Sequence, residues 1–278
     1  MDNRFDKSKD VTHVSINGIE LIQFNNLLKY KDVITHCFTT RHGGVSQKPY
    51  ESLNMAFNKK DERENVEENY RRVAKALEIE IENMVLSNQV HDSKIRVVTE
   101  EDRGKGIIRQ SDIIGFDGLA TNRRKVALVT FYADCVPVFL FDPVKTVISI
   151  AHSGWCGTVK EIAKEAVRKM KDAFFCEPKD ILAAIGPSIG RCCFEVGDEV
   201  YREFEANIEW STKYCEKKDG KWYFDLPAVI KNSLLNEGLA DDNIVLSGIC
   251  TKCNKDMFFS HRGDNGKTGT LAGIMMIN

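Results

Sequence analysis

The stretch at residues 126–161 constrains the fold more than any other part of the chain. Two apolar, β-rich runs within it bring Cys135 and His152, each of which could be a metal ligand or a nucleophile. We expect Cys135 at the end of a strand and His152 in a turn leading into a helix. The capping-box pattern of Thr158 and Glu161 predicts the start of that helix. Strand ends fix the position of a side chain and loops give access to it, so α/β proteins often place reactive groups there.

The rest of the chain alternates short β-rich runs with amphipathic helical patterns. Asn17-Gly18 between two alternating runs predicts a β-hairpin at residues 11–24. We expect further strands at 33–39, 84–87, 95–99, 116–121, 125–131, 181–185, 244–249, 257–260 and 271–277, helices at 65–77, 159–170, 196–204 and 226–235, and a mobile surface loop at 100–112. No repeat or flexible linker interrupts this pattern. The sequence therefore predicts one α/β to α+β domain over residues 1–278, with mixed β-sheets flanked by helices.

Charge and composition exclude several classes of partner. The chain has 39 basic and 41 acidic residues, a formal net charge of −2, which gives no electrostatic attraction to nucleic acid or anionic lipid. Residues 1–10 are charged and lack the apolar core of a signal peptide, and no run is long enough to span a membrane. We expect a cytoplasmic protein, in which the nine irregularly spaced cysteines are mostly thiols.

Cys135, His152 and His91 form the strongest set of candidate site residues. Two imidazoles and a thiolate suit Zn²⁺, and three protein ligands leave a fourth position open for water. The spacing alone favours a buried cysteine and two hydrogen-bonded histidines instead, because no tight Cys-x-x-Cys or His-x-x-x-His pair is present in this set. A third interpretation makes Cys135 the nucleophile of a Cys–His hydrolase or amidase, with His152 as base and His91 or Asp134 orienting it. Asp134 could also orient a histidine ligand.

Weaker signals lie elsewhere. Arg41 precedes a Gly-Gly loop and could hold an anion such as phosphate, and Arg262 is a similar cation at an expected strand end. Cys250 and Cys253 form a lone Cys-x-x-Cys pair. One pair is half a zinc site or a redox motif, so we expect these two cysteines to serve packing.

Several short motifs in order resemble the YfiH/laccase-domain family across most of the chain. They are FTTRHGGVS at 38–46, SLN at 52–54, NQVH at 88–91, DGLAT at 117–121, ADCVP at 133–137, AHSGW at 151–155, IGP at 185–187, CFEV at 193–196 and FFSHR at 258–262. The resemblance implies zinc ligands at His91, Cys135 and His152, and substrate contacts near Arg41. Asn54 and Arg262 also fall within family motifs, and we include them as candidate substrate- or phosphate-binding residues.

The resemblance further implies phosphorolysis of purine nucleosides (adenosine, inosine, guanosine and methylthioadenosine) and deamination of adenosine to inosine. The expected partners are these nucleosides and phosphate, and the expected state is a monomer or small homo-oligomer. The alternative is a copper polyphenol oxidase of laccase type, but six histidines are too few for a multicopper cluster. A protein that binds nucleosides without turnover is a further alternative. Three positions depart from the family pattern: Cys156 replaces a basic residue, Ser188 a cysteine and Thr270 an arginine.

Overall fold

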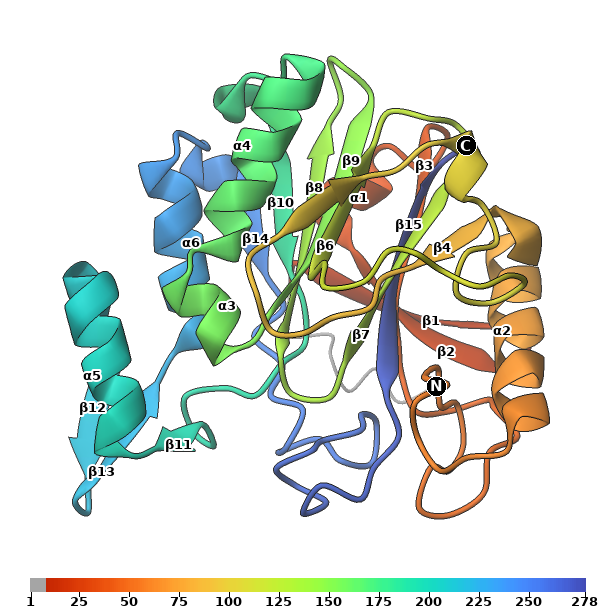
Figure 1. Ribbon diagram of the computed structural model, residues 1–278. Coiled ribbons are helices and arrows are strands. Elements are labelled where there is room, and N and C mark those ends of the chain that lie inside the picture. The colour runs from red at the N-terminus through yellow and green to blue at the C-terminus, as the bar shows by residue number, and fades with distance from the viewer. Residues whose placement is uncertain (1–8) are drawn as a thin grey trace.

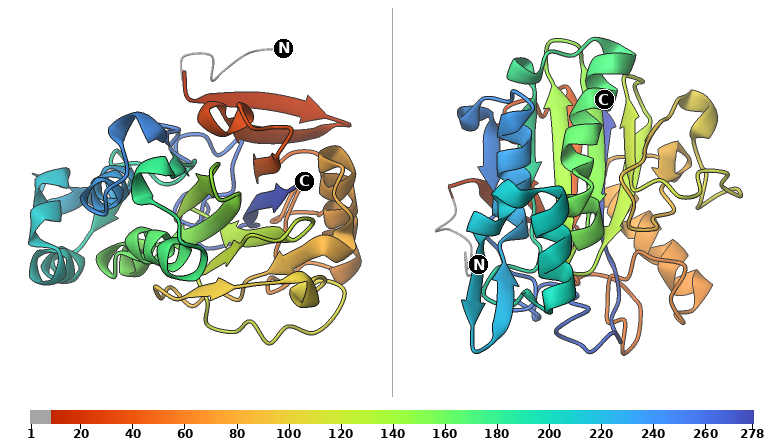
Figure 2. Two further views of the ribbon diagram at one scale, coloured as in Figure 1. Left: turned by 90° about the horizontal axis from the view of Figure 1, so that it is seen from above. Right: turned by 60° about the vertical axis from the view of Figure 1, so that its left-hand side comes forward.

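Two six-stranded β-sheets lie face to face, and helices cover their outer faces (Figures 1 and 2). This arrangement is seen in a computed structural model that describes residues 9–278. The sequence predicts that residues 1–10 are not a signal peptide, and most of these residues lie outside the described part of the chain. Within residues 9–278, no helix combines the length and apolar character needed to cross a bilayer.

The first sheet contains both the amino-terminal hairpin and the last strand of the chain. Its order is β1 (Val11–Ile16), β2 (Ile19–Phe24), β3 (Ile34–Thr39), β15 (Leu271–Ile277), β7 (Ala127–Tyr132) and β4 (Met84–Leu86). Asn17 and Gly18 both have positive φ, at 52° and 81°, which confirms the predicted hairpin turn. The short helix α1 (Asn25–Leu28) follows β2, and helix α2 (Arg63–Leu77) packs on the outer face of the sheet.

The second sheet carries the central stretch of the sequence. Its order is β14 (Ile244–Leu246), β10 (Leu182–Ile185), β8 (Val136–Asp142), β9 (Val147–Ser153), β6 (Gly118–Thr121) and β5 (Ile95–Val97). Its outer face is covered by α3 (Trp155–Val159), α4 (Ile162–Phe174) and α6 (Leu226–Asn236). Side chains from both sheets, including Phe38, Phe139 and Met275, fill the space between them. Burial of this apolar surface fixes the relative position of the two sheets.

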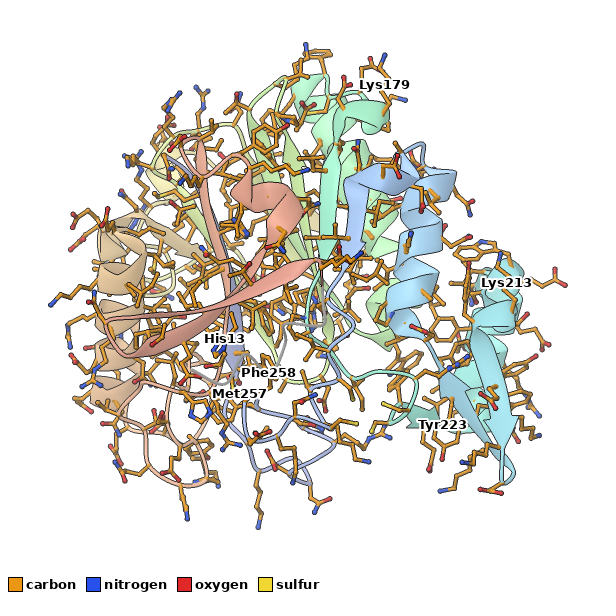
Figure 3. The ribbon with its side chains drawn as sticks, turned by 180° about the vertical axis from the view of Figure 1, so that it is seen from behind. His13, Lys179, Lys213, Tyr223, Met257 and Phe258 are labelled. Carbon is orange, nitrogen blue, oxygen red and sulfur yellow. The ribbon has the colours of Figure 1, made fainter. Side chains whose placement is uncertain are left out.

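A third, smaller sheet lies at the side of the molecule and was not predicted. It pairs β11 (Glu195–Val196), β13 (Lys221–Phe224) and β12 (Cys215–Lys218), and helix α5 (Asp198–Asn207) packs against it. Figure 3 shows Tyr223 on this sheet, apart from Met257 and Phe258, which belong to the core between the main sheets. The remaining elements are short 3₁₀ helices, namely η1 (Ile81–Asn83), η2 (Glu100–Asp102), η3 (Pro178–Asp180), η4 (Glu209–Tyr214) and η5 (Asp241–Asn243).

Four local predictions were wrong or incomplete. His152 lies in β9 and not in a turn, because the pairing of Val136 with Ser153 extends the strand past it. Helix α3 begins at Trp155 and not at Thr158, whose hydroxyl bonds back to the carbonyl of Gly154 at 2.8 Å. Residues 257–260 form turns and not a strand. The loop at 100–112 is folded against β4, with Leu86 N donating to the carbonyl of Lys105 at 3.0 Å.

Candidate metal centre and its cavity

The two sheets bring His91, Cys135 and His152 together. His91 lies in the loop between β4 and β5, Cys135 in the turn between β7 and β8, and His152 near the end of β9. Each offers one donor atom, and the three atoms all lie within 4.8 Å of one another. Cys135 Sγ is 3.9 Å from His91 Nε2, and the two imidazole rings meet edge to face with centroids 4.9 Å apart. Two imidazoles and a thiol at this separation have the donor types and spacing that could hold a metal ion with one position left open.

The buried carboxylate of Asp117 holds both histidines in place. His152 Nδ1 lies 2.8 Å from Asp117 Oδ1, so the ring donates its Nδ1 proton and leaves Nε2 free to bind a metal. The same carboxylate accepts backbone N–H groups from Val90, His91 and Asp92 at 2.9–3.0 Å. These bonds support the positive φ of 63° at His91. Burial opposes the charge of Asp117, but the hydrogen bonds from His152 and the backbone hold its pKa below the usual range.

Cys135 and His152 also influence each other's ionisation. Burial would raise the pKa of the Cys135 thiol, but the positive charge of His152 and hydrogen bonds from both imidazoles lower it. Burial would lower the pKa of His152, but the negative charge of Cys135 and the bond to Asp117 raise it. The protein therefore stabilises the thiolate, which is the form that binds metals and attacks electrophiles.

Gly154 leaves space beside this centre that no other residue would leave. A Cβ added at Gly154 would lie 3.0 Å from Cys135 Sγ and 3.0 Å from His91 Cδ2. The donor set and this open cradle both fit a bound metal ion. Thiolate and imidazole donors favour zinc or copper over the hard cations Mg²⁺ and Ca²⁺.

The three ligands line a cavity of about 550 Å³. Phe131 forms part of its wall, and Gln89 fixes that strand end by bonding both N and O of Phe131, at 2.7 and 2.9 Å. Three basic side chains also line the cavity, namely Lys59, His261 and Arg262. A cavity with an aromatic wall, basic side chains and a metal centre suits a small anionic or heteroaromatic ligand.

Asp134 and Arg262 lie in this cavity, as expected, but Asp134 does not orient a histidine. Its carboxylate accepts the Thr251 hydroxyl and the Arg262 backbone N–H, both at 2.6 Å. The Asp134 backbone has a positive φ of 86°. Asp134 therefore fastens the loop at 250–270 to the metal centre, while Asp117 performs the orienting role.

Arg41 and Asn54 do not line the cavity. The Arg41 guanidinium donates to the carbonyls of Glu51 and Lys255 at 2.7–3.0 Å and lies over the Phe259 ring. The buried Asn54 amide accepts from Thr270 N at 3.0 Å and donates to Asp61. Both residues shape loops that border the cavity.

Sequence reasoning named neither Asp117 nor the basic residues Lys59 and His261 as site residues. Asp117 lies in the DGLAT motif and His261 in the FFSHR motif, so both motifs could have indicated these residues. Lys59 lies in a polar loop, and only the fold brings it to the cavity. Thr270, one of the three departures from the family pattern, also lines this cavity.

Known proteins share this architecture. A model of the family described as multi-copper polyphenol oxidoreductase laccase matches residues 35–278. The purine nucleoside phosphorylase YlmD of Bacillus subtilis is 38% identical over 249 residues, covering 88% of each chain. A purine nucleoside phosphorylase of Bacteroides thetaiotaomicron is 32% identical over 92% of this chain and 96% of its own.

Solved structures agree with these relatives. YlmD from Geobacillus stearothermophilus superposes with a TM-score of 0.89 at 33% identity, covering 97% of this chain and 99% of its own. The Bacillus licheniformis protein YfiH superposes with a TM-score of 0.87 at 34% identity, covering 93% and 96%. The shared fold and the extent of the sequence match show that the chain belongs to the multi-copper polyphenol oxidoreductase laccase family, among relatives named as purine nucleoside phosphorylases.

Proposed function

We propose that the protein is a zinc-dependent purine nucleoside phosphorylase. Its substrates would be adenosine, inosine, guanosine and methylthioadenosine, each cleaved by phosphate to the free base and a (methylthio)ribose 1-phosphate. The observation that carries this proposal is the cluster of His91, Cys135 and His152 in the wall of a 550 Å³ cavity with basic side chains. The names of the relatives support the same reaction.

In phosphorolysis, different side chains of the cavity would bind the phosphate and the purine base. Phosphate attacks the anomeric carbon of the ribose while the bond to the purine nitrogen breaks and its electron pair leaves with the base. Arg262 and Lys59 would bind the phosphate oxygens, because cations compensate their charge, and His261 could donate a ring N–H to them. The Phe131 ring would stack on the purine.

His91, Cys135 and His152 would hold the metal, which would supply Lewis-acid chemistry when bound. The chain itself keeps the two histidines in the correct orientation through Asp117, and before a metal binds the positive charge of His152 lowers the pKa of the Cys135 thiol. We extend the proposal to deamination of adenosine, in which water adds to the purine carbon bearing the amino group and ammonia leaves. The cavity lined by His91, Cys135 and His152 has space for that water.

Two alternatives have weaker support. The multi-copper oxidase named in the family description needs several histidine-rich copper sites. Among residues 9–278, the groups of three or more potential metal ligands are His91–Cys135–His152 and a group of four cysteines, so only one contains histidine. A Cys–His hydrolase would use Cys135 and His152 in the same positions, but it would need no metal.

A product assay tests the proposal. Zinc-loaded protein is incubated with adenosine, with and without phosphate, and the products are separated by chromatography. We expect adenine and ribose 1-phosphate only when phosphate is present, and inosine without phosphate. Cys135→Ala should lose both activities, while Cys215→Ser, on the small sheet, should keep them. Absence of product from the wild type would overturn the proposal. Metal-independent amide hydrolysis blocked by iodoacetamide would favour the Cys–His hydrolase.

A further inference from the structure

Four cysteines from two distant parts of the sequence meet outside the proposed active site. Cys192 and Cys193 lie in the loop after β10, and Cys250 and Cys253 lie in the loop after β14. Strands β10 and β14 are neighbours and run parallel, so the loops that follow them leave the same edge of the second sheet. A further bridge between Ser188 and Cys250 continues this pairing into the loops. The lone Cys-x-x-Cys pair of the sequence therefore has a partner pair in the fold.

The distances between the sulfur atoms suit a tetrahedral metal and not a disulfide. All four Sγ atoms lie within 4.8 Å of one another. Cys253 Sγ is 3.6 Å from Cys192 Sγ and 3.5 Å from Cys193 Sγ. Four thiolates about 2.3 Å from one Zn²⁺ would stand roughly 3.8 Å apart. A disulfide requires about 2.05 Å, and all four cysteines are free thiols.

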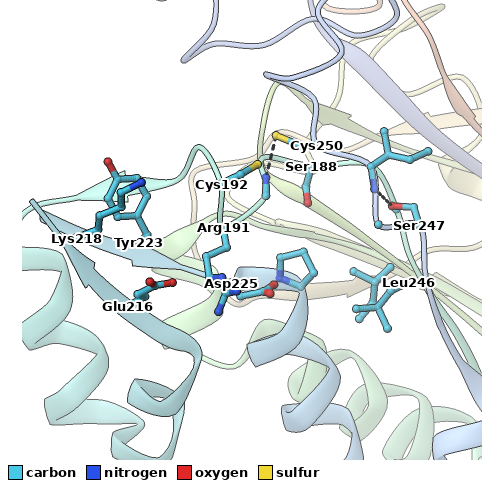
Figure 4. A pocket seen from close by; sticks show the side chains of 16 residues that line it. Ser188, Arg191, Cys192, Glu216, Lys218, Tyr223, Asp225, Leu246, Ser247 and Cys250 are labelled. Carbon is cyan, nitrogen blue, oxygen red and sulfur yellow. Dashed lines mark hydrogen bonds between the residues drawn. The ribbon is translucent and has the colours of Figure 1, made fainter.

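Backbone hydrogen bonds hold the two loops in this arrangement. Gly190 N donates to Cys250 Sγ at 3.3 Å, and Figure 4 shows this bond beside Cys192. Thr251 N donates to the carbonyl of Ser188 at 2.9 Å, and within the second loop the Asn254 side-chain Nδ2 donates to the carbonyl of Cys250 at 2.8 Å. N–H groups that point at a sulfur stabilise its thiolate form, as they do around bound metals.

We propose that Cys192, Cys193, Cys250 and Cys253 bind a structural Zn²⁺ ion, separate from the centre at His91, Cys135 and His152. Four protein thiolates complete a tetrahedral shell, so this site keeps no open position for a substrate. Cys192 and Cys250 line a cleft of about 690 Å³, shown in Figure 4, which gives an ion a route to the site. Cys192 and Cys253 are exposed, so the thiols are accessible.

The ion would connect two walls of the cavity of about 550 Å³ that is lined by His91, Cys135 and His152. Ile189 and Phe194 belong to the first loop, and His261 and Arg262 to the segment that follows the second. Arg262 Nη1 already donates to the carbonyl of Glu195 at 2.9 Å across this junction. A metal cross-link would fix the relative position of these walls, as a disulfide does in secreted proteins.

Metal analysis of the purified full-length chain tests the site. We expect two zinc ions per chain in the wild type. The double variant Cys192→Ser/Cys253→Ser, which alters the two exposed ligands, should lose one ion and keep the other. The matched control Cys215→Ser should keep both. A double variant with unchanged zinc content would overturn the proposal, as would an intact mass two hydrogens below that of nine free thiols.

A second measurement does not depend on how the serine variant folds. The variant His91→Ala/Cys135→Ala removes the first centre and leaves the four-cysteine group intact. X-ray absorption at the zinc edge should then show one ion with four sulfur neighbours at about 2.3 Å. Nitrogen or oxygen neighbours, or no bound zinc, would overturn the assignment. Neither result depends on nucleoside turnover, so the site and the proposed function can fail separately.

Discussion

At the scale of single residues, the proposed active site depends on groups that are not themselves ligands. The Asp117 carboxylate accepts hydrogen bonds from the His152 ring N–H and from the backbone N–H of His91. One buried charge therefore positions two of the three candidate ligands. The motifs predicted the ligands because cysteine and histidine carry recognisable chemistry. They did not predict the role of Asp117, because an aspartate in a strand-start motif has many ordinary uses and only its contacts distinguish them.

Gly154→Ala should weaken metal binding at the first centre. The added Cβ would meet both Cys135 and His91 at 3.0 Å, and either ligand would have to move. We expect an affinity loss of roughly tenfold or more, the range seen when groups that orient ligands are disturbed. Titration against a chelator measures the change.

Gly157→Ala is the matched control for this prediction. Gly157 lies in α3, which Gly154 directly precedes, and its added Cβ would make ordinary contacts at 3.4–3.5 Å. Equal metal affinity in the two variants would contradict a role for the open space at Gly154.

At the scale of elements, the sequence predicted most strands and helices, but it did not predict which groups the charged side chains in loops would contact. Strand β15 matches its predicted bounds, and the helical pattern after residue 159 gives α4. Strand β12 was missed because its sequence, Cys-Glu-Lys-Lys, is charged and largely exposed. Strand β13 was missed because Lys-Trp-Tyr-Phe is short and has no alternation of apolar and polar residues. Arg41 was assigned to phosphate on its neighbouring glycines. The structure shows that the Arg41 guanidinium already donates hydrogen bonds to the carbonyl groups of Glu51 and Lys255.

Substitution of the two arginines should separate these roles. Arg262→Gln should raise the KM for phosphate by about tenfold with a smaller effect on the KM for adenosine, because a cation that binds one substrate is lost. Arg41→Gln should instead lower the free energy of unfolding by about 1–3 kcal/mol, because carbonyls of Glu51 and Lys255 lose their donors.

Steady-state kinetics with each substrate varied, together with urea unfolding, measure both effects. Arg41→Gln with normal stability and a raised phosphate KM would restore the assignment made from the sequence.

At the scale of the whole molecule, the sequence predicted a single domain of mixed sheets flanked by helices, and the structure confirms it. The division of the strands between two sheets could not be predicted. It depends on long-range pairing, such as that of Gly273 with Phe38. No local pattern specifies which distant strand a given strand will join. The four-cysteine group was missed for the same reason, since its two halves meet only after β10 and β14 pair.

His36 should make the stability of the whole fold depend on pH. The ring is buried in the first sheet and accepts Phe24 N at 2.9 Å, and burial lowers the pKa of His36 to about 3 from 6.5. Between these two values the unfolded chain binds a proton that the folded chain does not. Stability is therefore lost as the pH falls below 6.5.

His36→Gln keeps an acceptor for Phe24 N but removes the titration. From pH 6.5 to about pH 5, the wild type should lose roughly 1.5 kcal/mol more unfolding free energy than this variant. Urea unfolding at the two pH values checks this, and parallel losses would show that His36 is not responsible.

The position of β15 has a consequence for biosynthesis. It lies between β3 and β7, so the middle of the first sheet stays open until residues 271–277 have been translated. Strands β1, β2 and β3 are therefore translated long before the neighbour that completes their sheet. During that interval the exposed edge of β3 is a site where two nascent chains could associate. Folding yield should thus depend on how quickly translation reaches and completes β15.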